Sequence, residues 1–312
     1  MGVVGRAAGI ADYHGYFIPE LWAPKMLWGF EKRTVLEAIA STEYEGMIKK
    51  QGDTVHINIE PTVTINDYVK GQKLVRESLT PSKVTLEIDT AKSYSIHVDD
   101  IDEAQANLSL IDTFAESAGK RLKEKIDYTV LHAIYNDEAT YNSGATAGYD
   151  SRAFNLGVST IPLALTENNI LDKLADIATV LDERDVPEEG RSIVLPPVFC
   201  NLLLKSDLKD ASFSGTGPTI TLNGKLPKQL AGFDVYRSRQ LYSVADGTSP
   251  YPTCFYCIAL HKSALTFASQ LVETRAVVAN DTFGNYIDGL HVFGYKVVRS
   301  EALAIMYAYY AG

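Results

Sequence analysis

An unusually long helical pattern runs through the middle of the chain and limits the folds that the sequence can adopt. Between Asp102 and Asn136 there is no proline, and Gly119 is the only glycine. Asp102 and Gln105 resemble a capping box, with Asp in place of the usual Ser or Thr. Apolar residues recur at steps of three or four, as on one face of an α-helix, at positions 104, 108, 111, 115, 118, 122, 126, 130 and 133. The pattern predicts a helix of 35 residues, about 52 Å long at about 1.5 Å per residue.

A helix of this length is an outlier, because helices in globular proteins average about 11 to 12 residues. Its apolar stripe is rich in alanine and lacks the sustained leucines of a coiled-coil seam. We therefore interpret it as a spine along an elongated domain.

Three segments before the helix alternate between apolar and polar residues, which predicts strands with one buried face. Their apolar positions are 55, 57 and 59, then 84, 86 and 88, and finally 94, 96 and 98. Between the first two lies a long polar tip, residues 66–83, which carries Lys70, Lys73, Arg76 and Glu77. A two-stranded ribbon is marginally stable alone, and a connection of this length is usually functional or disordered. We expect the ribbon to lie on another surface.

The first 30 residues combine glycines and prolines with six aromatic residues, among them Trp22 and Trp28. Such a segment is not a regular amphipathic helix, yet its aromatic side chains favour burial. It is predicted to be an extended arm that packs on its own body or on a neighbour. From Glu31 onward, apolar residues return at helical spacing, and a helix is expected to continue until Gly52.

The second half of the chain has the pattern of an α/β region. A connector rich in Gly, Ser, Thr and Tyr, residues 137–165, precedes a helix that Thr166 is expected to cap. The run SIVLPP predicts a buried strand and then a short helix with Pro197 in its first turn. Further strand-like runs are GFDVYRS, CFYCIALH, LTFASQLVETRAVVA, LHVFGYKVVRS and ALAIMYAYY, the last of which is apolar on both faces and predicted to be buried.

Composition excludes several classes of protein. Hydrophobic residues make up 46% and charged residues 22% of the chain, as in globular proteins. The formal net charge of -10 disfavours a dedicated nucleic-acid reader. Three cysteines are too few for a disulfide-stapled scaffold. No apolar run is long enough to span a bilayer, and neither a secretory signal nor a myristoylation motif begins the chain. The sequence thus predicts a soluble, acidic protein made inside a cell.

Candidate chemical sites have plainer interpretations. Cys254 and Cys257, with His261 nearby, lack the second ligand pair of a zinc site, and residues three apart on a strand point to opposite faces. The acidic cluster Asp99, Asp100, Asp102 and Glu103 lies where a helix N-terminus attracts negative charge. No phosphate-binding glycine loop, H-E-x-x-H motif or G-x-S-x-G motif is present. We predict no catalytic, cofactor-binding or metal-binding residues and no cofactor.

The predicted arm, ribbon and long helix have one property in common. None of them can bury enough apolar surface within one compact body to be stable there. Together they predict an elongated subunit that completes its packing on neighbouring subunits. That combination is typical of an assembly protein.

Extended segments of the chain resemble the major capsid proteins of tailed double-stranded DNA bacteriophages, which have the Hong Kong 97-type coat fold. FIPELWAPKMLWGFEKRTVLEAIAS and YEGMIKKQGDTVHINI resemble the family's N-terminal arm and the start of its ribbon. VTLEIDTAKSYSIHVDDIDEAQANLSLIDTFAESAGKRLKEKIDYTVL resembles its returning strand and spine helix. SIVLPPVFCNLLL, LAGFDVYRSRQL and FGYKVVRSEALAIMYAYY resemble the axial domain and the closing strands. The similarity covers nearly the whole chain in the same order.

The resemblance implies an α+β fold with an N-terminal arm, an extended two-stranded loop, a long spine helix and an axial α/β domain. The expected parts are an arm and first helix (1–52), a ribbon (53–98), a peripheral domain with the spine (99–165), an axial domain (166–288), and closing strands that return to the peripheral domain (289–312). It also implies inter-subunit contacts by the arm and by the ribbon tip, through Trp22, Trp28, Lys70, Lys73, Arg76 and Glu77.

The implied function is self-assembly into hexamers and pentamers of an icosahedral shell around the genome. The implied partners are further copies of the chain, a separate scaffolding protein, a portal protein, possibly a decoration protein, and packaged DNA bound without sequence specificity, with no membrane. The protein would be found in the virion after assembly in the host bacterial cytoplasm. An acidic inner wall would avoid retaining the DNA. Covalent cross-linking of Lys70 or Lys73 to Asn280 or Asn285 is not predicted, because no motif supports it.

Two alternatives remain open at the level of sequence. An encapsulin-type nanocompartment shell is built from similar subunits, and a neighbouring peroxidase or ferritin-like gene would favour it. A soluble hydrolase using the Asp99–Asp102 carboxylates would be a compact monomer or dimer with those groups in a pocket.

Overall fold

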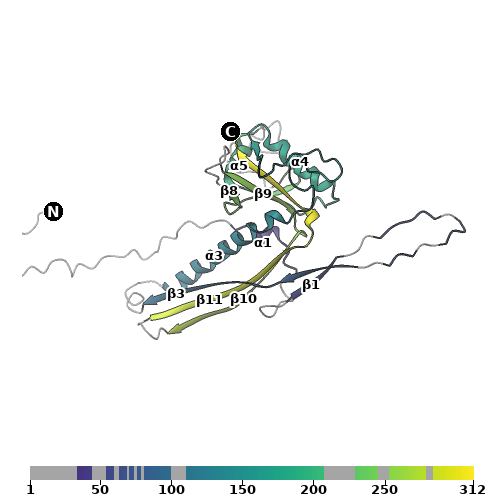
Figure 1. Ribbon diagram of the computed structural model, residues 1–312. Helices are drawn as coiled ribbons and strands as arrows, with labels where there is room; N and C mark the ends of the chain where they lie inside the picture. The colour runs from purple at the N-terminus through teal and green to yellow at the C-terminus, as the bar shows by residue number, and fades with distance from the viewer. Residues whose placement is uncertain are drawn as a thin grey trace, which may run out of the picture.

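The computed structural model consists of a body built on one sheet and, next to it, a long helix that lies along a second, longer sheet (Figure 1). A two-stranded ribbon projects away from both at the end where β1 lies. It describes residues 34–43, 54–59, 63–68, 70–73, 76–78, 81–99, 110–206, 229–244, 253–278 and 284–312. The predicted arm with Trp22 and Trp28 lies outside these ranges, as do residues 100–109 and 207–228.

The compact body is built on a seven-stranded mixed sheet with the strand order β4-β12-β9-β5-β7-β6, and β8 pairs with β9. Its strands are β4 (Leu163–Leu165), β5 (Arg191–Leu195), β6 (Gln229–Leu230), β7 (Phe233–Arg237), β8 (Ser243–Val244), β9 (Cys254–His261) and β12 (Leu303–Tyr310). Helices α4 (Ile170–Asp182) and α5 (Pro197–Lys205) pack their apolar side chains into the same core. All five residues of β5 are buried, which confirms the prediction from its continuous apolar run.

Two helix starts test the expectations for this body. Pro197 occupies the first turn of α5, as predicted. Helix α4 begins four residues after Thr166, because the Asn169 side chain organises a turn before it. Its Oδ1 accepts a hydrogen bond from the Thr166 amide at 2.8 Å, and its Nδ2 donates to the Ala164 carbonyl at 2.9 Å. The predicted Thr166 cap is therefore wrong.

The second layer is a three-stranded antiparallel sheet with the order β10-β11-β3. Its strands are β3 (Thr90–Asp99), β10 (Leu265–Val278) and β11 (Gly284–Val297). Helix α3 (Leu110–Leu131) lies along this sheet (Figure 1) and contacts both β3 and β11. Its 22 described residues span about 33 Å at about 1.5 Å per residue.

The spine helix ends earlier than its sequence pattern suggests. After Leu131 the chain turns and forms a short 3-10 helix, η2 (Ile134–Asn136), rather than continuing straight to Asn136. Ile134 is fully buried in the core of the body, and Tyr135 stacks on Tyr242. These contacts require the chain to leave the helical direction. The predicted capping box at Asp102 lies outside the described residues.

The sheet pairings differ from the expected division of the chain. β10, expected in the axial domain, lies in the long sheet, and β12, expected with the peripheral domain, pairs antiparallel with β9 in the body. The short turn after His261 sends β10 directly out of the body, and η4 (Ser300–Ala302) brings the chain back before β12. Alternation in a sequence predicts which faces are buried but not which strands pair.

The first helix is also shorter than predicted. Helix α1 spans Leu36–Ile39, and the chain is already extended at Ala40. Ser41 then forms a parallel bridge to Thr266 of β10. The Ser41 amide donates to the Leu265 carbonyl at 2.8 Å, and the Phe267 amide donates to the Ser41 carbonyl at 2.9 Å. Those bonds replace the next helical turn, and residues 44–53 lie outside the described part of the chain.

The ribbon pairs β1 (Thr54–Ile59) antiparallel with β2 (Ser82–Glu87), which confirms the two predicted strands. Its base packs on the long sheet through a small apolar cluster separate from the main core, Ile57, Leu86, Ile88, Ala268 and Val292. The backbones approach closely here, because a Cβ atom on Gly294 of β11 would lie 2.2 Å from the Glu87 carbonyl oxygen. The absent side chain of Gly294 therefore permits this contact.

Replacing Gly294 with Ala should lower the free energy of unfolding by about 1–3 kcal/mol, the usual cost of overpacking. Gly119→Ala is the matched control, since a Cβ atom at that position in α3 meets nothing within 4 Å. We expect Gly119→Ala to stabilise the protein by about 0.5–1 kcal/mol, because alanine favours helices over glycine. Urea unfolding of unassembled subunits would measure the free energy of unfolding of both variants. An equal change in the two variants would contradict the close approach of the backbones at Gly294.

Candidate subunit interface

The tip of the ribbon extends beyond β1 and β2, away from the rest of the molecule (Figure 1). Every described residue from 63 to 78 is exposed, including Lys70, Lys73, Arg76 and Glu77. Glu77 accepts hydrogen bonds from the Thr64 amide at 3.1 Å and from the Thr64 hydroxyl at 3.3 Å. Glu77 therefore joins the two sides of the ribbon, whereas the three basic side chains carry positive charge at its surface.

The projecting part of the ribbon, residues 63–78, also exposes large apolar side chains that the predicted contact set did not include. Val63, Ile65 and Tyr68 are 62%, 93% and 64% exposed. Exposed apolar groups gathered on one projecting element mark interaction sites. The signal was present in the sequence, because Val63 and Ile65 continue the alternation of positions 55, 57 and 59.

Residues 34–41, here named the anchor segment, attach the chain to the spine helix. The side chains of Val35, Leu36 and Ile39 are buried in the main core beside Ile126 and Val130 of α3. On the surface, Lys123 of α3 pairs with Glu37 of α1 at 2.8 Å.

Asp127 of α3 makes the polar part of this attachment. Its Oδ1 accepts hydrogen bonds from the amides of Val35 at 3.1 Å and Leu36 at 2.8 Å. No side chain within α1 itself caps the helix start, so this distant carboxyl group takes that role. Burial raises the pKa of Asp127 to about 6, and the two amide hydrogen bonds oppose the shift only in part.

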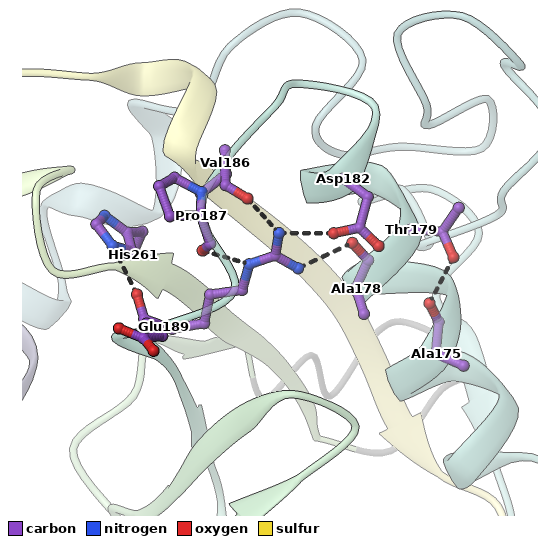
Figure 2. A network of polar contacts seen from close by, with 9 residues as sticks. Ala175, Ala178, Thr179, Asp182, Val186, Pro187, Glu189 and His261 are labelled. Carbon is purple, nitrogen blue, oxygen red and sulfur yellow. Dashed lines mark hydrogen bonds and ion pairs between the residues drawn. The ribbon is translucent and has the colours of Figure 1, made fainter.

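The loop of residues 183–190 is held by the buried guanidinium of Arg191, whose partners Val186, Pro187, Ala178 and Asp182 are labelled in Figure 2. Arg191 Nε donates to the Pro187 carbonyl at 2.9 Å, and Nη1 donates to the Ala178 carbonyl at 3.4 Å. Nη2 donates to the Val186 carbonyl and pairs with Asp182 Oδ1 at 2.6 Å. One side chain thus closes the C-terminal end of α4 and fixes the loop that follows.

The same loop has a second attachment at Glu189. His261 Nε2 donates to the Glu189 carbonyl at 2.9 Å, and its Nδ1 lies 2.7 Å from the Ser263 hydroxyl. Burial lowers the pKa of His261, so the neutral ring is favoured. Since both ring nitrogens have partners, this histidine has a structural role.

The two partners of the Arg191 ion pair should respond differently to substitution. Arg191→Lys should destabilise the protein by about 2–4 kcal/mol, because it leaves buried carbonyls without donors. Asp182→Asn should cost less than about 1 kcal/mol, because the Asp182 side chain is 54% exposed while that of Arg191 is 2% exposed. Thermal unfolding of both variants would test this, and a larger effect of Asp182→Asn would contradict it.

The candidate chemical groups are accounted for where the structure describes them. Cys200, Cys254 and Cys257 are buried and not joined in disulfides, and burial raises the pKa of Cys200 to about 11. Among the described residues no cluster of His, Cys, Asp and Glu has the arrangement of a metal site. Nor does any described helix combine the length and apolarity needed to cross a membrane. Asp100, Asp102 and Glu103 of the acidic cluster lie outside the described residues.

Comparison with solved structures defines the class of fold. A chain of Mycobacterium phage Che8 is 26% identical and matches with a TM-score of 0.72, over 93% of this chain and 97% of that chain. The capsid of cyanophage P-SCSP1u is 16% identical, with a TM-score of 0.69 over 95% and 94% of the two chains. The mature capsid of bacteriophage PhiM1 is 19% identical, with a TM-score of 0.65 over 96% of each chain. The fold is the α+β Hong Kong 97-type coat fold.

The family follows from the sequence match. The family model described as phage capsid protein matches residues 82–306, well over half of the chain. The chain therefore belongs to the phage capsid protein family and is a structural component of a virion. A comparison with curated proteins found no significant match.

Proposed function

We propose that the protein is a major capsid protein that assembles into hexamers and pentamers of an icosahedral shell enclosing double-stranded DNA. The observation that carries this proposal is the projecting ribbon, whose exposed apolar side chains are not covered by any of the residues that the structure describes. A neighbouring copy would supply that cover and stabilise a two-stranded element that is marginal alone. Membership of the phage capsid protein family supports the same conclusion.

Charge favours the same partner for the ribbon tip. Lys70, Lys73 and Arg76 lie exposed on a projecting element of a chain whose net charge is -10. An acidic surface of a neighbouring subunit would attract them, and the attraction would weaken as salt increases. Trp22 and Trp28 would contribute a second contact through the N-terminal arm. Glu77 has two roles in this proposal. It stabilises the ribbon through its hydrogen bond from Thr64, and it also contributes to the interface.

The further partners belong to the same proposal. They are a separate scaffolding protein, a portal protein, a decoration protein where the shell carries one, and DNA held without sequence specificity behind an acidic inner wall. Assembly would take place in the host bacterial cytoplasm, and the role is structural, not enzymatic. The peripheral domain of this proposal comprises α3 with the β10-β11-β3 sheet, and the axial domain comprises the seven-stranded sheet with α4 and α5.

Light scattering of the purified protein, combined with negative-stain electron microscopy of the same fractions, tests the proposal. Closed shells or rings of five or six subunits are expected, alone or after addition of a scaffolding protein. A compact monomer that never associates, even with a scaffolding protein, would contradict it. Shells that contain an enzyme and no DNA when isolated from cells would instead support a nanocompartment.

The ribbon contact can be tested by placing a charge on its exposed apolar surface. Ile65→Asp should reduce shell formation at least tenfold, because burying an unpaired carboxylate is unfavourable. Gln72→Asp, which adds the same charge to an exposed polar position of the tip, should have a much smaller effect. Neither variant should change the unfolding midpoint of the subunit. Equal assembly of Ile65→Asp and the unaltered protein would contradict the ribbon's proposed role.

A further inference from the structure

A buried carboxyl group joins the anchor segment to the spine helix, and one of its oxygens is not used. Asp127 is only 1% exposed. Its Oδ1 accepts both amide hydrogen bonds, from Val35 and Leu36. Its Oδ2 is buried and has no hydrogen-bond partner among the described residues. An ionised carboxylate in this position would have an unsatisfied charged oxygen in an apolar environment, which is unfavourable.

A protonated carboxyl group fits the same geometry better. The proton would reside on Oδ2, and Oδ1 would remain an acceptor for both amides. Neither hydrogen bond to α1 would have to break when the group takes up a proton. Loss of the proton would retain the hydrogen bonds but add the cost of a buried charge.

We propose that Asp127 makes the docking of the anchor segment on the spine helix pH-dependent, with tighter docking when its carboxyl group is protonated. The anchor segment lies in the predicted first helix, which begins at Glu31 directly after the predicted arm in the first 30 residues. Asp127 therefore controls how firmly the chain that follows the arm is held against α3.

The surrounding charges agree with this direction. Glu37 of α1 acts on Asp127 with like charge, and Lys123 of α3 is already paired with Glu37 at 2.8 Å. β10 contributes the bridge between Thr266 and Ser41, which is uncharged. The described groups around Asp127 thus add negative rather than positive charge.

The sign of the pH dependence follows from the pKa of Asp127, which burial raises from 3.8 to about 6. When the anchor segment leaves, Asp127 becomes solvated and its pKa returns toward the ordinary value. The docked state therefore binds the proton more tightly, and docking weakens as the pH rises through about 6. With these two pKa values the docking equilibrium falls about tenfold between pH 5 and pH 7.

Hydrogen–deuterium exchange of peptides covering residues 34–41 in the full-length protein measures docking directly. Protection would be expressed relative to the intrinsic exchange rate at each pH, with the assembly state checked by light scattering. The unaltered protein should lose about tenfold in protection from pH 5 to pH 7. Asp127→Asn, which keeps an acceptor oxygen without the charge, should show nearly constant protection and exceed the unaltered protein at pH 7.

Two further variants separate this role from general effects. Glu116→Gln removes an exposed carboxylate from the same helix and should leave the pH dependence unchanged. Asp127→Ala removes the acceptor and should lower protection at both pH values. The same pH profile in Asp127→Asn and the unaltered protein would overturn the proposal, as would protection that rises with pH in the unaltered protein. The isosteric Asn variant decides the question even where Asp127→Ala does not fold.

Discussion

The antiparallel pair β10 and β11 joins the compact body to the spine helix and to the ribbon. Its length sets how far these two elements extend from the body. Each strand has 14 residues. At its base the hairpin continues into β9 and, through η4, into β12 of the compact body. Along its length it supports α3, β3, the ribbon base and the bridge to Ser41. Because strands this long extend beyond the body's core, apolar groups such as Val277 and Val278 at its far end are exposed.

That geometry divides the subunit into a well-covered body and poorly covered extensions. The body buries β5 and β12 almost completely, as expected for apolar strands covered on both faces. The ribbon, in contrast, packs through a small apolar cluster at its base, and among the described residues no such cluster lies beneath its tip. A subunit with this distribution gains its missing apolar contacts by association, which is the physical basis of the proposed assembly.

Patterns of local periodicity predicted most of the elements correctly. The ribbon strands, the fully buried β5, the start of α5 at Pro197 and the buried closing strand β12 are all confirmed. These elements depend on residues close in sequence, whose side-chain spacing shows which faces are buried. Val63 and Ile65 of the ribbon follow the same alternation, beyond the three apolar positions 55, 57 and 59 of the predicted strand.

Contacts between distant residues were not predictable from the same patterns. The partners of β10 and β12 depend on pairing across the chain, and helix α1 stops where Ser41 meets β10. Asp127 caps the start of a helix that lies 91 residues away in sequence. In the sequence it therefore cannot be told apart from the other charged residues of the spine helix. The arm contacts proposed for Trp22 and Trp28 stay a prediction, because those residues lie outside the described part of the chain.

The central claim is that the exposed ribbon tip is covered by a neighbouring subunit. Cryo-electron microscopy of the assembled particle tests it most directly, by tracing residues 63–78 of one subunit relative to the next. Val63, Ile65 and Tyr68 are expected to contact a neighbouring copy of the chain. A shell in which those side chains remain in solvent, with subunits joined through other surfaces, would contradict it.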